Sequence, residues 1–184
     1  QKPKQKLSKW GKCVKKFAEN FHPHGGESPK TIKKELKINI LYEESFMYTV
    51  AIDVGGTEIK YALFSEDAEI IEQSKVPTPY GKEKFKTVII QIVQAFEENY
   101  SLDGLGLSLP GYINSKTGFA ERGGALMFLD QTNIIELLKE DLSLPIFIEN
   151  DANCAALAES GFGHAVGVSD FLLLTVGTGI GGAL

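Results

Sequence analysis

Two short segments rich in glycine and threonine carry the residue types of a phosphate-binding site. The first is Asp53-Val54-Gly55-Gly56-Thr57, and the second, from Thr175 to Gly182, contains four glycines. Because glycine lacks a Cβ atom, backbone N–H groups in such turns can approach an anion closely, and a threonine hydroxyl adds a donor. Each segment follows an apolar run typical of a buried strand. The pair predicts two phosphate-binding turns, whereas either turn alone would be equally typical of a hairpin.

Acidic and amide side chains lie beside these turns. Asp53 ends the first apolar strand, where a carboxylate is suited to hold a hydrated Mg²⁺ over phosphates. Asp151, in Glu149-Asn150-Asp151, follows another apolar strand and could orient a hydroxyl and accept its proton during phosphoryl transfer, while Asn150 could fix neighbouring hydroxyls. Asp151 also precedes a helix-forming stretch, so a role as helix N-cap stays open.

The candidate residues for the nucleotide and its metal come from both turns. We expect them to be Asp53, Gly55, Gly56, Thr57, Lys60, Gly177, Thr178 and Gly179, with Asp53 as the metal ligand. Strand alternation leaves open that Lys60 simply faces solvent. His164 is expected in a solvent loop, and Cys154 and Glu159 are expected to be structural. The spacing matches neither a P-loop nor a dinucleotide fingerprint.

Hydrophobic periodicity indicates how these residues are positioned. It predicts strands at 46–53, 58–65, 69–76, 103–109 and 145–149, helices at 82–100, 132–141 and 152–160, and one long glycine-containing loop after Pro110. Three antiparallel strands followed by alternating helices and strands predict an α/β domain with a mixed sheet and flanking helices. Ligands bind at the strand ends of such sheets. Asp53, Pro110 and Asp151 are therefore expected to converge on one cleft.

Charge is unevenly distributed along the 184 residues. The net charge is −5, but residues 1–45 hold 11 of the 19 basic and 5 of the 24 acidic residues, which leaves 8 basic against 19 acidic residues elsewhere. A domain this acidic is a poor nucleic-acid surface, because binding to phosphates requires Lys and Arg. We expect residues 1–45 to be a basic, disordered extension, since they lack a sustained apolar period.

Cysteine content and hydropathy indicate the cellular compartment in which the protein is expected. The two cysteines, Cys13 and Cys154, form no CxxC pair, so neither a disulfide framework nor a closed zinc site is indicated. No apolar stretch approaches the roughly 18 residues that span a bilayer, and the lysine-rich start lacks the apolar region of a signal peptide. We expect a cytoplasmic protein with no membrane partner.

Four ordered motifs resemble the ROK family of sugar kinases and sugar-responsive regulators, within the actin-like ATPase superfamily. The segments at 53–57 and 175–182 resemble its two phosphate motifs, and 108–111 with Gly118 resembles its sugar-side loop. Residues 149–159 resemble its most specific stretch, in which the aspartate is the catalytic base. The resemblance implies an actin-like (ribonuclease H-like) lobe at 46–165. Its implied substrate-binding residues are Pro110, Gly111, Gly124, Asn150 and Asp151.

The resemblance also implies an activity and leaves alternatives open. It implies an ATP- and Mg²⁺-dependent hexokinase of the glucokinase type, acting on the sugar 6-hydroxyl and dimeric when full length. A kinase for a β-glucoside, fructose or N-acylhexosamine, or a sugar-responsive transcriptional regulator, remains the alternative. Residues 123–130 replace an Asn-Leu-Pro and tryptophan segment common in the family, which leaves the sugar undetermined. We expect residues 166–184 to begin a truncated second lobe, whose missing part would carry any zinc.

Overall fold

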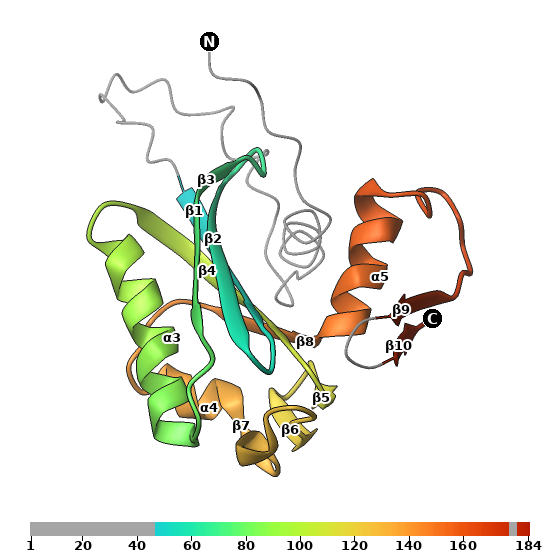
Figure 1. Cartoon of the computed structure of the whole chain (residues 1–184). Helices are drawn as coiled ribbons and strands as arrows, with labels where there is room; N and C mark the ends of the chain where they lie inside the picture. Colours follow the sequence, from blue (N-terminus) through green and yellow to red (C-terminus); the bar gives the residue numbers. More distant parts are fainter. Residues whose placement is uncertain (1–46, 177–179) are drawn as a thin grey trace, which may run out of the picture.

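A five-stranded mixed sheet forms the centre of the computed structural model, which describes residues 47–176 and 180–184 (Figure 1). Its strand order is β3-β2-β1-β4-β8, with β1 antiparallel to β2, β2 antiparallel to β3, and β1, β4 and β8 parallel. The strands are β1 (Met47–Val54), β2 (Glu58–Ser65), β3 (Ile70–Pro77), β4 (Ser101–Leu109) and β8 (Ile146–Asn150). The expected mixed sheet is confirmed.

Two helices cover one face of this sheet. They are α3 (Lys82–Glu97) and α4 (Ile134–Lys139), which lie together in Figure 1. Phe85, Ile89 and Val93 recur at helical spacing on α3 and are fully buried against the strands. The main core between helices and sheet also includes Val50, Ile52, Ile59, Leu63, Leu105, Leu107, Ile134, Leu138 and Ile148. Burial of this apolar layer is the main stabilising contribution to the fold.

The segment after Pro110, which we expected to be a long loop, instead contains a second small sheet. Its strands are β5 (Tyr112–Asn114), β6 (Phe119–Arg122) and β7 (Thr132–Asn133), in that order, with a 3₁₀ helix η1 (Met127–Leu129) between β6 and β7. Strands this short carry too few residues to show alternation in sequence. Ile113 and Ala120 in these strands are buried, and this burial depends on tertiary contacts. Because the resemblance places the expected substrate residues Pro110, Gly111 and Gly124 here, we call residues 110–131 the substrate-side segment.

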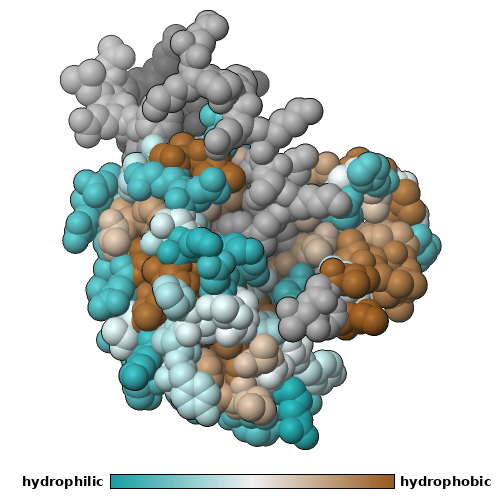
Figure 2. All heavy atoms as spheres, in the orientation of Figure 1, coloured by the Kyte–Doolittle hydropathy of each residue, from teal (hydrophilic) through white to brown (hydrophobic). Residues whose placement is uncertain are grey.

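The last described elements form a separate layer. Helix α5 (Asp151–Phe162) leaves the end of β8 and packs on the antiparallel hairpin of β9 (Leu173–Val176) and β10 (Ile180–Ala183) (Figure 1). The apolar patch in this part of Figure 2 fits the exposure of four hairpin-region side chains, Leu172, Leu174, Val176 and Ile180. None of the helices within the described ranges is long and apolar enough to cross a membrane.

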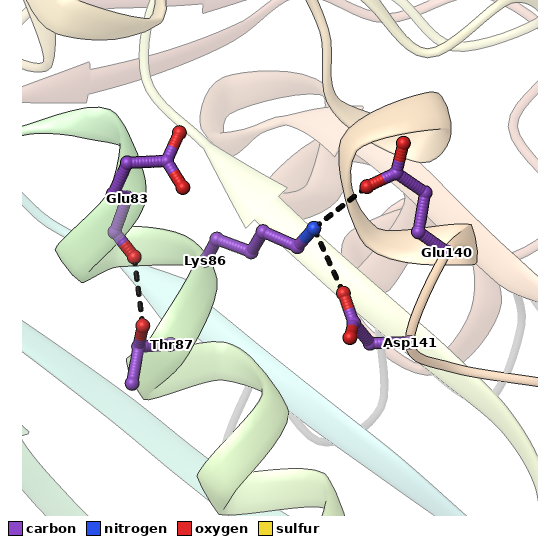
Figure 3. Close-up of polar contacts among 5 residues, drawn as sticks. All are labelled: Glu83, Lys86, Thr87, Glu140 and Asp141. Carbon is purple, nitrogen blue, oxygen red and sulfur yellow. Dashed lines mark hydrogen bonds and ion pairs between the residues drawn. The ribbon is translucent and has the colours of Figure 1, made fainter.

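An ion cluster joins α3 to the end of α4 (Figure 3). Lys86 Nζ lies 2.8 Å from both Glu140 Oε2 and Asp141 Oδ2, and the Lys86 side chain is only 17% exposed. Hydrogen bonds to these carboxylates, first to Asp141 and then to Glu140, hold the pKa of Lys86 above its ordinary value. The cluster therefore ties the two helices together at the edge of the core.

We expect Lys86→Gln to lower the thermal unfolding temperature, because the two carboxylates lose their shared cation. The difference from wild type should shrink in 1 M NaCl, since salt screens exposed charges. Lys84→Gln is the matched control: Lys84 is exposed on the same helix and forms no ion pair with another described residue. Equal loss of stability in both variants, measured by circular dichroism, would contradict a specific role of the cluster.

Candidate active site

The pairing of three parallel strands brings the predicted polar residues to one edge of the sheet. Asp53 on β1 pairs in register with Ser108 on β4, and Ser108 pairs with Glu149 on β8. Pro110 directly follows β4, and Asp151 directly follows β8. Because the carboxyl ends of parallel strands meet at the same edge, these side chains share one site.

Asp53 is a half-buried carboxylate with a defined hydrogen-bond partner. The Ser108 hydroxyl, itself 2% exposed, donates a hydrogen bond of 2.9 Å to Asp53 Oδ1. Burial raises the pKa of Asp53; the Ser108 hydrogen bond and the charge of Lys60 oppose this shift, and the negative charge of Asp151 adds to it. Asp53 and Asp151 thus interact electrostatically across the site. A cation between them would relieve both the desolvation and the repulsion.

The donor set at this edge fits Mg²⁺. Within the described ranges, no three His, Cys, Asp or Glu side chains are grouped so that they could hold a metal ion by themselves. Mg²⁺ does not require such a cage, because it keeps several waters and is commonly held by one or two carboxylates plus substrate phosphates. Asp53 is the residue that would hold Mg²⁺, and the positive charge of the ion would offset the negative charge of the phosphates.

The first glycine turn (residues 55–57) is hydrogen-bonded through its carbonyl groups and exposed at Gly56 and Thr57. Gly55 N–H donates to the Glu58 carbonyl at 2.9 Å, and the Gly55 and Thr57 carbonyls accept bonds from the hydroxyl and N–H of Thr78. Gly56 and Thr57 are exposed, and no described residue accepts a hydrogen bond from either backbone N–H. These two backbone donors therefore have no partner among the described residues.

Two parts of the substrate-side segment, residues 110–111 and 122–124, pack closely on each other through two glycines. Gly111 has φ 99° and Gly124 has φ 60°, backbone conformations that residues other than glycine rarely adopt. A Cβ atom on Gly111 would overlap the Arg122 carbonyl and lie 2.7 Å from Gly124 N. One on Gly56 would lie 3.0 Å from Ala125 Cβ, so this segment also contacts the first glycine turn. The first glycine turn and the substrate-side segment are thus direct neighbours.

Asn150, not Asp151, caps helix α5. Asn150 Oδ1 accepts hydrogen bonds from Ala152 N at 2.9 Å and Asn153 N at 3.2 Å. Its Nδ2 donates to the Gly111 carbonyl at 2.7 Å, which joins the substrate-side segment to α5. Asp151 is the first helical residue and is exposed, and its Oδ1 accepts from its neighbour Ala152 N at 2.8 Å. The cap role left open for Asp151 therefore belongs to Asn150, and the Asp151 carboxylate is accessible.

The other predicted site residues are placed as follows. Lys60 is exposed and pairs with Asp53 across β1 and β2, so it lies beside that carboxylate. Gly177, Thr178 and Gly179 lie outside the described residues. The His164 side chain is 96% exposed, in agreement with a solvent loop. Sequence reasoning included Ser108 in the 108–111 motif but did not predict its hydrogen bond to Asp53. It missed Thr78, for which the sequence carried no signal.

Comparison with known proteins identifies the family. The family model described as "ROK family" matches residues 49–184. This chain belongs to the ROK family, as its four motifs indicated. Its mixed sheet with flanking helices is the actin-like ATPase fold that its structural neighbours share.

Similar proteins include several that are named sugar kinases. The chain is 39% identical to a beta-glucoside kinase of Listeria monocytogenes over 140 residues, covering 75% of this chain and 46% of that protein. It is 34% identical to a glucokinase of Halalkalibacterium halodurans over 143 residues, covering 73% and 43%. The chain thus spans less than half the length of these relatives.

Solved structures agree with this assignment. A ROK family glucokinase from Streptomyces griseus, in complex with glucose and AMPPNP, superposes with a TM-score of 0.65 at 30% identity, covering 73% of this chain and 43% of that one. A ROK hexokinase from Thermus thermophilus gives 0.64 at 34% identity, covering 74% and 46%.

We expect Gly111→Ala to destabilise the protein by at least about 1 kcal/mol, because it adds a steric overlap to a strained backbone conformation. Gly167→Ala is the matched control: Gly167 has φ 79°, but its added Cβ would meet nothing within 4 Å. The free energies of unfolding of both variants are measured in urea, and their difference gives the contribution of the steric overlap at Gly111. Equal destabilisation would show that close packing at Gly111 is unimportant.

We expect Asp53→Asn to stabilise the ligand-free protein at pH 7, because a neutral amide removes the cost of burying a charge. Since burial raises the folded-state pKa of Asp53, the wild-type carboxylate weakens folding as pH rises above its ordinary value of 3.8. The advantage of the variant should therefore be larger at pH 7 than at pH 4. Thermal unfolding at both pH values measures this, and an advantage that grows on acidification would contradict it.

Proposed function

We propose that this chain forms part of an ATP-dependent sugar kinase of the glucokinase type, which transfers the γ-phosphate of ATP to a sugar 6-hydroxyl. The observation that carries the proposal is the placement of Asp53 and the accessible Asp151 carboxylate at the ends of β1 and β8, the two strands that flank β4, beside an exposed glycine turn. The names of the relatives support it, since they include beta-glucoside kinases, glucokinases and an N-acetyl-D-glucosamine kinase.

The nucleotide would lie against the first glycine turn. The N–H groups of Gly56 and Thr57 bind phosphate oxygens, and Lys60 adds positive charge beside Asp53. Asp53 would hold Mg²⁺, which when bound would neutralise charge on the transferred phosphoryl group. The second predicted turn, Gly177 to Gly179, lies outside the described residues, and its contribution to phosphate binding stays a prediction.

The sugar would lie between the substrate-side segment and the start of α5. Asp151 accepts the proton of the attacking hydroxyl as its oxygen bonds to the γ-phosphorus. The bond from that phosphorus to the β–γ bridging oxygen breaks, and ADP leaves. Asn150 fixes the geometry, because its amide ties Gly111 to the α5 N-terminus that carries Asp151. Pro110 and Gly124 line the same side and restrict which sugar fits.

We expect Asp151→Asn to lower kcat by about 10²- to 10⁴-fold, the usual contribution of a positioned base. The assay uses the product of the complete open reading frame that contains this chain, with ATP and a panel of glucose, β-glucosides, fructose and N-acylhexosamines. Asp67→Asn, at the exposed turn between β2 and β3, is the control and should retain wild-type turnover.

Two results would count against this proposal in different ways. Equal turnover by Asp151→Asn would refute the base assignment alone. No phosphorylation of any sugar in the panel by the wild-type protein would refute the kinase function itself.

A further inference from the structure

Thr78 is the residue through which β3 holds the first glycine turn. It directly follows the last residue of β3, Pro77, and is half-buried. Its hydroxyl donates a 2.7 Å hydrogen bond to the Gly55 carbonyl, and its backbone N–H donates a 2.9 Å bond to the Thr57 carbonyl. One residue therefore fixes two carbonyls of a three-residue turn.

The hydroxyl contact determines the direction of a neighbouring backbone donor. The Gly55 carbonyl and the Gly56 N–H belong to the same peptide unit, and the described chain contains no cis peptide bond. In a planar trans peptide these two groups point in opposite directions. With the Gly55 carbonyl directed at Thr78, the Gly56 N–H is directed away from Thr78, on the open side of the turn.

A Gly-Gly peptide needs such a restraint more than other sequences do. Glycine tolerates both signs of φ, so the peptide between Gly55 and Gly56 can rotate at low steric cost. A rotated peptide would turn its carbonyl oxygen toward a bound phosphate, and two negative groups would then face each other. The hydrogen bond from the Thr78 hydroxyl stabilises the orientation that presents the N–H.

We propose that Thr78 is a positioning residue for ATP binding, and that its hydroxyl orients the Gly56 N–H toward the phosphates. This inference rests on the proposed kinase function and deepens it on the nucleotide side. The pairing of β2 with β3 does not depend on the hydroxyl. The bond from the Thr78 backbone N–H and the 2.7 Å ion pair of Lys75 with Glu58 both remain when the Thr78 side chain is changed. The effect of the hydroxyl can thus be measured apart from folding.

The test compares Thr78→Val, which removes the hydroxyl at constant shape, with Thr78→Ser, which keeps it. Calorimetric titration with Mg-AMPPNP, on the product of the complete open reading frame, should show binding weakened about three- to tenfold in Thr78→Val, as expected for one lost hydrogen bond. Thr78→Ser should bind within twofold of wild type. In turnover assays, the KM for ATP should rise in Thr78→Val while the KM for the sugar stays constant.

Thr87→Val is the matched control. Thr87 Oγ1 donates a 2.9 Å bond to the Glu83 carbonyl on α3 (Figure 3), so this variant loses the same kind of contact away from the turn. It should leave AMPPNP binding unchanged. If Thr78→Val does not fold, as judged by circular dichroism, Thr78→Ala decides the same comparison against Thr78→Ser.

Equal AMPPNP affinity in wild type and Thr78→Val, or equal losses in Thr78→Val and Thr78→Ser, would overturn the role of the hydroxyl while leaving the kinase function intact. A parallel rise in the KM for the sugar would also overturn it, because it would indicate a general structural defect. Absence of both nucleotide binding and sugar phosphorylation in the wild-type protein would overturn the kinase function and this inference together.

Discussion

Parallel backbone pairing of β1, β4 and β8 is the constraint on which the site depends. Hydrogen bonding between the strands sets Asp53 level with Ser108, and Ser108 level with Glu149, although these residues are far apart in sequence. The helices α3 and α4 bury the opposite side chains of the same strands, so a slip of one residue would exchange core and site residues. Core packing and site geometry are therefore specified by the same register.

Partial burial of Asp53 and the charge of Asp151 make ionisation of Asp53 unfavourable at this edge of the sheet. Desolvation and a neighbouring negative charge both disfavour the ionised carboxylate, while the Ser108 hydroxyl and Lys60 offset only part of that cost. Such a site gains from a bound cation and from the polar groups of a substrate. The chemistry proposed here thus uses an arrangement that is unfavourable in the free protein.

Backbone contacts organise the remainder of the site. Gly111 and Gly124 let residues 110–111 and 122–124 of the substrate-side segment, directly after β4, approach each other more closely than a side chain would permit. Asn150 then connects that segment to α5, and Thr78 connects the first glycine turn to β3. These contacts bring the turn, the segment and the helix start into one neighbourhood, where phosphate and sugar hydroxyl could meet.

The sequence by itself determined the main sheet, its covering helices and the positions of Asp53 and Asp151 at strand ends, because apolar periodicity and glycine turns are local signals. It did not determine β5, β6 and β7, whose few residues pair only through tertiary burial. Nor did it distinguish Asn150 from Asp151 as the helix cap, since both residue types cap well and only the folded geometry selects one. The roles of Ser108 and Thr78 likewise depend on partners distant in sequence, which only the tertiary structure brings within hydrogen-bond reach.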